Sequence, residues 1–228
     1  MDGFEDKEFE YESGRKYVSD SVISRLPRYF RYLRMLLESG RTRINSTELS
    51  SLMHLTASQI RQDLNCFGGF GKQGVGYDIR YLHTCISAIL GADRQYTAVI
   101  IGAGDLGRAL ARSRMFSGRG ITVLSLFDVN RQLIGQETAD ILIRDMDELV
   151  PFCCANKVDI AVLTVPKESF EDAVRRIGEA GIKGVWNFTS MELDPEQQGF
   201  VIENVHLGDS LQRLTYHLRV AQDKEKEN

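Results

Sequence analysis

The sequence predicts an α/β protein in two parts, a small helical part that ends in a β-hairpin and a larger part built on a parallel β-sheet. Three observations lead to this fold class. Apolar residues recur at helical spacing up to residue 66, a glycine-rich stretch follows at residues 68–76, and from Tyr96 onward buried-strand runs alternate with helical stretches. With 228 residues and 43% hydrophobic residues, the chain is long enough to form two cores.

The charges are unevenly distributed, although the net charge is only −4. Residues 1–14 are acidic and show no helical or strand period, so we expect a disordered tail there. Residues 15–85 contain eleven Lys and Arg against five Asp and Glu, a net charge of +6, whereas residues 86–228 carry −5. The basic charge is thus concentrated in the first part, where it would favour a nucleic-acid partner.

The sequence contains no run of about 18 apolar residues and no basic-then-apolar leader, so we expect a cytoplasmic protein. The four cysteines, Cys66, Cys85, Cys153 and Cys154, form no C-x-x-C pair and have no histidine at metal-ligand spacing. We therefore expect neither a bound metal nor a disulfide framework.

Three helices are predicted in the first part. Pro27 suits the start of a helix that Gly40 ends. Asn45 and Glu48 have the spacing of a capping box, which predicts a short second helix. Thr56 is a suitable N-cap for a third helix.

The third helix is amphipathic, since Ile60, Leu64 and Phe67 fall on one face. Its opposite face is polar and cationic. That face carries Ser58, Arg61, Gln62 and Asn65. The glycine-rich stretch that follows predicts a tight hairpin with Lys72 and Gln73 at its tip, and three helices followed by such a hairpin are typical of a winged helix, a helix-turn-helix variant.

A further helix is predicted around residues 81–90, before the second part begins. The alternation in the second part then predicts a doubly wound parallel sheet. Its strands are expected at 98–101, 122–127, 160–165 and 185–188, and helices at 106–115 and 169–180. The last segment, 209–220, is an amphipathic helix with Leu211, Leu214 and Leu218 on one side.

The motif with the clearest chemistry is Gly102-Ala103-Gly104-Asp105-Leu106-Gly107, which directly follows a predicted strand and opens a helix. This is the context of the Rossmann dinucleotide fingerprint, in which a glycine turn and a helix N-terminus accept the pyrophosphate. Asp128 stands at the end of the next strand, where a carboxylate binds the ribose hydroxyls and repels a 2′-phosphate. The sequence therefore predicts a Rossmann-like NAD(H)-binding domain.

The remaining strand ends carry groups suited to binding. Thr164-Val165-Pro166 and Asn187-Phe188-Thr189 offer hydroxyl and amide groups on the ligand side of the sheet. The four histidines, His54, His83, His206 and His217, lie outside these strand ends, so no proton donor is evident and we expect no catalysis. The alternative is an NAD-dependent oxidoreductase or cofactor-binding protein whose accessory domain binds no DNA.

In the winged helix, Arg61 is suited to a bidentate contact with guanine and Gln62 to a contact with adenine. Lys72 is suited to contact a DNA phosphate or to enter the minor groove. Arg28, Arg31 and Arg34 recur along the first helix.

These residues together resemble the Rex family of redox-sensing transcriptional repressors of bacteria, over about 22–218. The resemblance rests on the stretches 24–27, 59–64, 67–68, 71–77, 127–129, 163–166 and 180–188. It implies a homodimer with a domain-swapped C-terminal helix, and a repressor that NADH releases from operator DNA. It implies domains at 1–14 (tail), 15–90 (winged helix), 91–206 (Rossmann-like), 207–220 (swapped helix) and 221–228 (charged tail).

The resemblance also implies site residues. For DNA these are Arg28, Ser58, Gln59, Arg61, Gln62, Asn65, Lys72, Gln73 and Gly74, within a helix-turn-helix region of about 27–66. For the cofactor these are Val129 and the residues of the stretches named above: the glycine turn 102–107, Asp128, 164–166 and 187–189. Family members usually carry an Asp before the swapped helix that engages an arginine at the position of Arg31; here that Asp is His206, and we expect a weaker or differently coupled redox switch.

Overall fold

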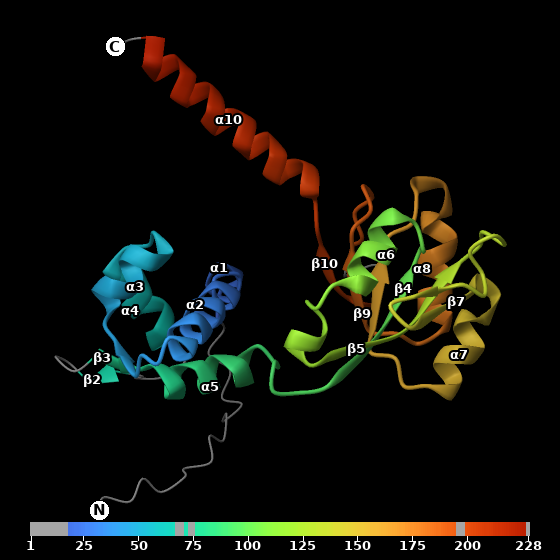
Figure 1. Cartoon of the computed structure of the whole chain (residues 1–228), viewed down its shortest axis with the longest axis horizontal. Coiled ribbons are helices and arrows are strands. Elements are labelled where there is room, and N and C mark those ends of the chain that lie inside the picture. The colour runs from blue at the N-terminus through green and yellow to red at the C-terminus, as the bar shows by residue number, and fades with distance from the viewer. Residues whose placement is uncertain (1–17, 67–70, 73–75, 195–198, 227–228) are drawn as a thin grey trace, which may run out of the picture. The chain divides into compact units, whose positions relative to one another are not determined.

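The computed structural model describes residues 18–66, 71–72, 76–194 and 199–226 of the chain. The chain divides into two compact units, Met1–Arg94 and Gln95–Asn228 (Figure 1). The division falls close to the boundary expected after residue 90. The expected tail at 1–14, and Phe67, Gln73 and Gly74, lie outside the described residues.

The first unit begins with a short helix that the sequence pattern did not predict, α1 (Asp20–Ile23). The predicted first helix is α2 (Leu26–Glu38), with Pro27 in its first turn, where a missing N–H costs no hydrogen bond. Leu26, Tyr29 and Leu33 are its fully buried side chains.

The next two helices have the predicted caps. In α3 (Ser46–Met53) the Asn45 side chain accepts from the Glu48 N–H at 2.9 Å, and Glu48 Oε2 accepts from the Asn45 N–H at 3.3 Å, so both halves of the capping box are present. In α4 (Ala57–Asn65) the Thr56 hydroxyl accepts from the Gln59 N–H at 3.1 Å. The predicted inward residues Ile60 and Leu64 are buried.

The predicted hairpin is formed by β2 (Gly71–Lys72) and β3 (Gly76–Asp78), which pair antiparallel. A two-residue strand that the sequence pattern did not predict, β1 (Arg43–Ile44), pairs with the other edge of β3 and gives the order β1-β3-β2. Helix α5 (Ile79–Ile89) follows directly, capped by Asp78. The winged-helix arrangement of three helices and a hairpin is therefore present in this unit.

The second unit is a sheet of order β10-β9-β8-β4-β5-β7-β6, in which only β6 runs antiparallel to its neighbour. The parallel strands, numbered from β4, have the order 3-2-1-4-5-6 of a dinucleotide-binding Rossmann sheet. The strands are β4 (Tyr96–Ile101), β5 (Ile121–Asp128), β6 (Glu137–Thr138), β7 (Ile141–Asp145), β8 (Ile160–Leu163), β9 (Gly184–Asn187) and β10 (Val201–Asn204).

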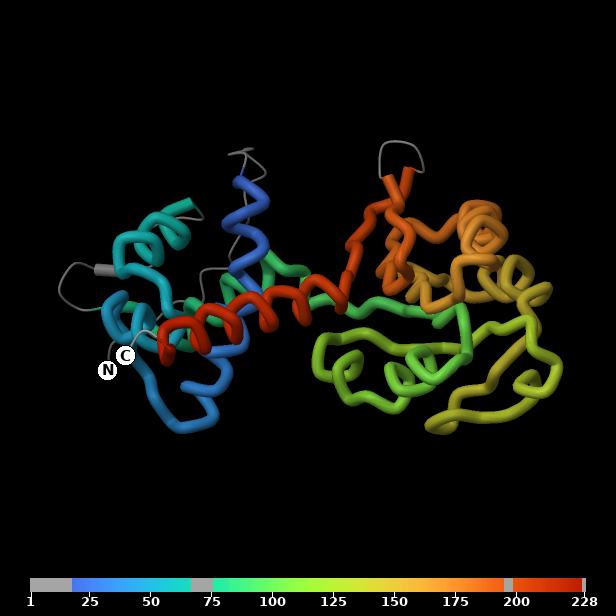
Figure 2. Tube along the Cα trace, turned by 90° about the horizontal axis from the view of Figure 1, so that it is seen from above, coloured from blue at the N-terminus to red at the C-terminus, as the bar shows by residue number. Residues whose placement is uncertain are grey.

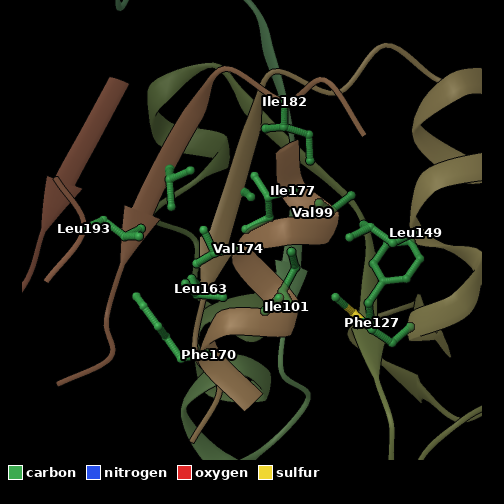
Figure 3. Close-up of a cluster of buried hydrophobic side chains, with 14 residues drawn as sticks. Val99, Ile101, Phe127, Leu149, Leu163, Phe170, Val174, Ile177, Ile182 and Leu193 are labelled. Carbon is green, nitrogen blue, oxygen red and sulfur yellow. The ribbon is translucent and has the colours of Figure 1, made fainter. Parts of the chain in front are cut away.

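Helices cover both faces of this sheet (Figure 2). Val99 and Ile101 pack in one core cluster with residues of α7 and α8, whereas Ile100 packs in another with residues of α6. Figure 3 shows the first cluster, with Phe170, Val174 and Ile177 of α8 against the strands. The helices are α6 (Asp105–Arg112), η1 (Ser117–Arg119), η2 (Met146–Glu148), α7 (Leu149–Ala155), η3 (Lys167–Ser169) and α8 (Phe170–Glu179).

The last helix is α10 (Leu207–Lys226), and it has no buried residue. It is longer than the predicted segment 209–220, so most of the expected charged tail at 221–228 is helical instead. An ion pair between Arg219 and Asp223 at 3.7 Å, one turn apart, favours this extension. None of the described helices is long and apolar enough to cross a membrane.

Candidate functional site

The glycine turn joins β4 to α6, and its three glycines have different surroundings. Gly102 has a positive φ of 99°, and a Cβ there would lie 2.7 Å from the Thr164 carbonyl oxygen. A Cβ on Gly107 would lie 2.0 Å from the Gly102 carbonyl oxygen. Around Gly104, the N-cap of α6, there is open space. A ligand can therefore approach the backbone at Gly104, beside the positive end of the helix.

Asp128 is built into this turn. Its Oδ2 accepts from the Ala103 N–H at 2.6 Å, and its Oδ1 accepts from the Asn130 N–H at 2.8 Å. Each carboxylate oxygen has a second lone pair, which stays available to a ribose hydroxyl. Asp128 thus holds the glycine turn in place and faces the same side of the sheet as Gly104.

A hollow of about 130 Å³ lies beside the turn and is walled mainly by apolar side chains. It brings together five predicted cofactor residues: Gly102, Asp128, Val129, Val165 and Pro166. The sequence patterns missed its other lining residues, which are Ile101, Phe127, Met146, Ser169, Asp172 and Ala173. An apolar hollow beside the Asp128 carboxylate, at the end of a parallel strand, suits a purine nucleoside.

Thr164 reaches the turn but uses its hydroxyl there. Thr164 Oγ1 donates to the carbonyl oxygens of Ile101 at 3.1 Å and Gly102 at 2.9 Å. It therefore ties the end of β8 to the glycine turn, a positioning role that differs from the direct binding predicted for it.

The predicted set at the end of β9 is also engaged within the chain. Asn187 is fully buried, donates to the Met191 carbonyl and the Asn204 side chain, and accepts from both the N–H and the hydroxyl of Thr189. Phe188 packs edge-on against Trp186, with ring centroids 4.4 Å apart. These side chains shape the loop after β9 and offer a ligand few free polar atoms.

In the first unit, the outward face of α4 is assembled as predicted. Ser58, Arg61, Gln62 and Asn65 line one open hollow of about 510 Å³, together with Cys66. Arg61 donates to the Ser46 hydroxyl at 3.0 Å, so α3 supports it. Polar and cationic groups spaced along one helix face are suited to base edges in a major groove.

Two other predicted DNA residues have partners inside the unit. Gln59 Nε2 donates to Asp63 Oδ1 at 3.0 Å, so part of its amide is engaged within the unit. Arg28 donates to the Met53 carbonyl at 2.5 Å, at the C-terminal end of α3. Lys72 belongs to the wing strand β2, where it pairs with Gly76.

The two predicted switch residues have local partners. Arg31 lies over the Tyr32 ring, with 5.5 Å from its guanidinium carbon to the ring centroid. His206 Nε2 lies 3.6 Å from Glu192 Oε1, and its carbonyl accepts from the Asp209 N–H at the start of α10. His206 therefore marks the junction between β10 and α10.

His83 is the histidine with a perturbed environment. It stacks on Phe30 with ring centroids 4.4 Å apart, and its Nε2 is buried without a hydrogen-bond partner. Burial, and then the positive charge of Arg34, lower the pKa of His83. Among the residues that the structure describes, no cluster of three or more His, Cys, Asp and Glu could hold a metal ion.

A winged-helix unit with a cationic reading face, followed by a Rossmann unit with a dinucleotide turn, defines a ligand-responsive DNA-binding regulator. Two family models match the chain: "Putative DNA-binding protein N-terminus" over residues 17–65 and "CoA binding domain" over residues 93–191. The redox-sensing transcriptional repressor Rex of Clostridioides difficile is 48% identical over 90% of this chain and 98% of its own length. The chain belongs to the Rex family of redox-sensing transcriptional repressors.

Other relatives give the same result. The Rex protein of Clostridium botulinum strain Alaska E43 is 47% identical over 89% of this chain and 96% of its own length. The crystal structure of RSP with beta-NAD+ and operator DNA has a TM-score of 0.84 and 43% identity, covering 93% of this chain and 97% of that one. RSP with beta-NADH has a TM-score of 0.84 and 41% identity, covering 94% of this chain and 100% of that one.

Proposed function

We propose that this chain is a redox-sensing transcriptional repressor that binds operator DNA as a homodimer and leaves it when NADH binds. The observation that supports this most strongly is the presence, in one chain, of a winged-helix reading face and a glycine turn with Asp128. The relatives are named as transcriptional repressors, and we propose no catalytic role for this chain.

The dinucleotide would bind along the carboxyl ends of the strands. Its pyrophosphate would meet the backbone at Gly104 and the N-terminus of α6, and Asp128 would accept from the adenosine ribose. The hollow between Val129, Val165 and Met146 would hold the adenine. When bound, the nicotinamide supplies a ring that differs between its redox forms by a hydride and one charge.

The DNA would be read by α4. Arg61 and Gln62 would contact base edges, and Ser58, Asn65 and the wing around Lys72 would contact the adjacent groups. Residues 15–90 would form the DNA-binding domain and residues 91–206 the dinucleotide domain. Helix α10, which begins at Leu207, would be exchanged between subunits, since five of its large hydrophobic side chains are exposed in the single chain.

Redox control requires only an equilibrium between two arrangements. A ligand shifts such an equilibrium by as much as its affinities for the two states differ. NADH would therefore release the DNA if it binds the DNA-incompetent arrangement more tightly than the DNA-competent one. No bond needs to be made or broken.

A DNA-binding titration tests this proposal. The operator duplex of the RSP complex serves as the probe, at one fixed salt concentration, because phosphate contacts make affinity steeply dependent on ionic strength. We expect the affinity to fall as the NADH to NAD⁺ ratio rises, and Arg61→Ala to weaken binding at every ratio. An affinity that is the same at all ratios would contradict the redox response.

A further inference from the structure

The face of α4 that points away from the proposed DNA contacts contains a charged residue with no exposure to solvent. Asp63 is 0% exposed, and its carboxylate is surrounded by hydrogen-bond donors. Arg25 donates through Nε to Oδ2 at 2.8 Å and through Nη2 to Oδ1 at 2.7 Å. The Tyr29 hydroxyl donates to Oδ2 at 3.0 Å, and Gln59 donates to Oδ1 at 3.0 Å.

These contacts join two helices in a defined geometry. Arg25 is the N-cap residue of α2 and Tyr29 lies one turn further along it, so the carboxylate is held from two points on α2. A forked guanidinium pairs with a carboxylate in nearly one plane. The neighbouring contacts of Ile60 and Leu64 are apolar, and they are less directional than these hydrogen bonds.

The orientation of α4 matters for the site described above. Arg61 and Gln62 are the two residues directly before Asp63, so any rotation at Asp63 moves them by the same angle. Bidentate contacts with guanine and adenine need both atoms of a side chain in register with a base edge. Gln59, whose amide faces Asp63, belongs to this internal network.

We propose that Asp63 is a positioning residue for DNA recognition: bound by Arg25, Tyr29 and Gln59, it sets the orientation in which α4 presents Arg61 and Gln62 to operator DNA. The inference rests on the proposed function. A buried ion pair is weak evidence for stability alone, because apolar replacements of both partners are often neutral or stabilising. Asp63 would contribute to selectivity between sequences, and less to the attraction between the chain and DNA in general.

The test compares two full-chain variants with the wild type. Asp63→Asn removes the charge and leaves Arg25 without its partner. The triple variant Arg25→Met, Tyr29→Phe and Asp63→Leu replaces the network by apolar groups and keeps the net charge. Each is assayed for thermal unfolding and for affinity to the RSP operator duplex and to a scrambled duplex of equal length, at one salt concentration.

We expect the wild type to prefer the operator duplex, and both variants to lose at least about tenfold of that preference, within the range that separates specific from non-specific binding. We expect Asp63→Asn to unfold at a lower temperature, and the triple variant to regain most of that loss. Leu82→Ala is the matched control, because Leu82 is a fully buried residue of α5 outside the network. It should lower the unfolding temperature and keep the preference for the operator.

The outcomes separate the explanations. A triple variant that folds and keeps the wild-type preference for the operator would overturn the positioning role. A triple variant that fails to fold would also overturn it, because the network would then be needed for the folding of the first unit and not for the orientation of α4. A Leu82→Ala variant that loses the same preference would overturn it too. A wild type that binds both duplexes equally, with or without NADH, would instead contradict the proposed function, and this inference with it.

Discussion

The three glycines of the turn are needed for different physical reasons. Gly102 and Gly107 have no room for a Cβ, because carbonyl oxygens lie 2.7 Å and 2.0 Å from where it would be. Gly104 faces open space, so packing does not exclude a side chain there, and its bare backbone is open to the proposed dinucleotide. Packing therefore requires glycine at positions 102 and 107, whereas at position 104 glycine leaves the backbone accessible.

Asp128 should determine the choice between the two dinucleotides. Asp128→Asn removes the charge that would accept from the ribose, and a hydrogen bond to a charged group contributes about 1.5–3 kcal/mol. We expect NADH to bind roughly ten- to a hundredfold more weakly, and the preference for NADH over NADPH to narrow. Isothermal titration with both dinucleotides measures this.

Asp145→Asn is the matched control for that experiment. Asp145 lies beside Asp128 in the register of β7 and β5 but does not line the hollow, and its loss changes the net charge equally. We expect the Asp145→Asn variant to bind NADH with the wild-type affinity. A wild-type chain that binds NADPH as tightly as NADH would show that Asp128 does not have this role.

Asp63 should make the first unit sensitive to acid. Burial alone raises the pKa of this carboxyl, but hydrogen bonds from Arg25, Gln59 and Tyr29 outweigh burial, so its pKa lies below the ordinary value of 3.8. A depressed pKa in the folded state stabilises the fold above the unfolded-state pKa, and this stabilisation is lost as the pH falls below about 4. We expect the free energy of unfolding to fall in that range.

Urea denaturation between pH 3 and 6, followed by circular dichroism, measures the effect of Asp63. The difference in unfolding free energy between wild type and Asp63→Asn should shrink as the pH falls below about 4. Glu38→Gln removes only an exposed ion pair with Arg34 at 3.8 Å, so it should change the free energy of unfolding much less than Asp63→Asn does at pH 6. A constant difference across the range would mean that the Asp63 carboxyl does not contribute through its charge.

Individual residues were predictable where the signal is local. The glycine turn, Asp128 and the capping pair Asn45 and Glu48 could be predicted from the spacing of these residues along the sequence. Asp172 and Met146 were missed, because crossovers of the chain bring them to the hollow from α8 and from the end of β7. The hydrogen bond from Gln59 to Asp63 could not be predicted, because nothing in the local pattern indicates that the carboxylate one turn away is buried.

Helices α3, α4 and α5 begin after residues whose side chains cap them, so these cap residues should contribute measurably to stability. Asn45→Ala removes the acceptor for the Glu48 N–H at 2.9 Å and should destabilise the unit by about 1 kcal/mol. Thermal unfolding followed by circular dichroism would show the loss as a shift of several degrees. Ser51→Ala, at an exposed position within α3, should leave the unfolding temperature nearly unchanged.

The helices and strands that the sequence predicted are longer and more regular in their apolar pattern than those that it missed. Helices α2, α4, α5 and α8 and the central strands repeat their apolar pattern often enough to be recognised. The two-residue strands β1 and β6 have no period of their own and exist through pairing with β3 and β7. The edge strand β10 was also missed, since half of its residues are exposed and interrupt the apolar run. Strand β7 was missed too, although none of its residues is exposed, because its apolar run is only three residues long.

Helix α10 presents exposed apolar side chains in a chain of ordinary composition. Both units have their own buried clusters, yet α10 buries none of its side chains. Leu207, Leu211, Leu214 and Leu218 are each 55–62% exposed and follow the helical spacing that places them on one face. A stripe of leucines on one side of a long helix is a typical surface for a second subunit.

The dimer should therefore depend on this stripe. Replacing Leu211, Leu214 and Leu218 by Ser removes the apolar area that would be buried between subunits, so sedimentation should report monomers where the wild type forms dimers. Operator affinity should fall strongly in the same variant, because a monomer contacts only one half-site. Gln212→Ser alters a residue of α10 outside the leucine stripe and should leave the dimer intact. Monomers that bind the operator as tightly as the wild type would break the proposed link between assembly and repression.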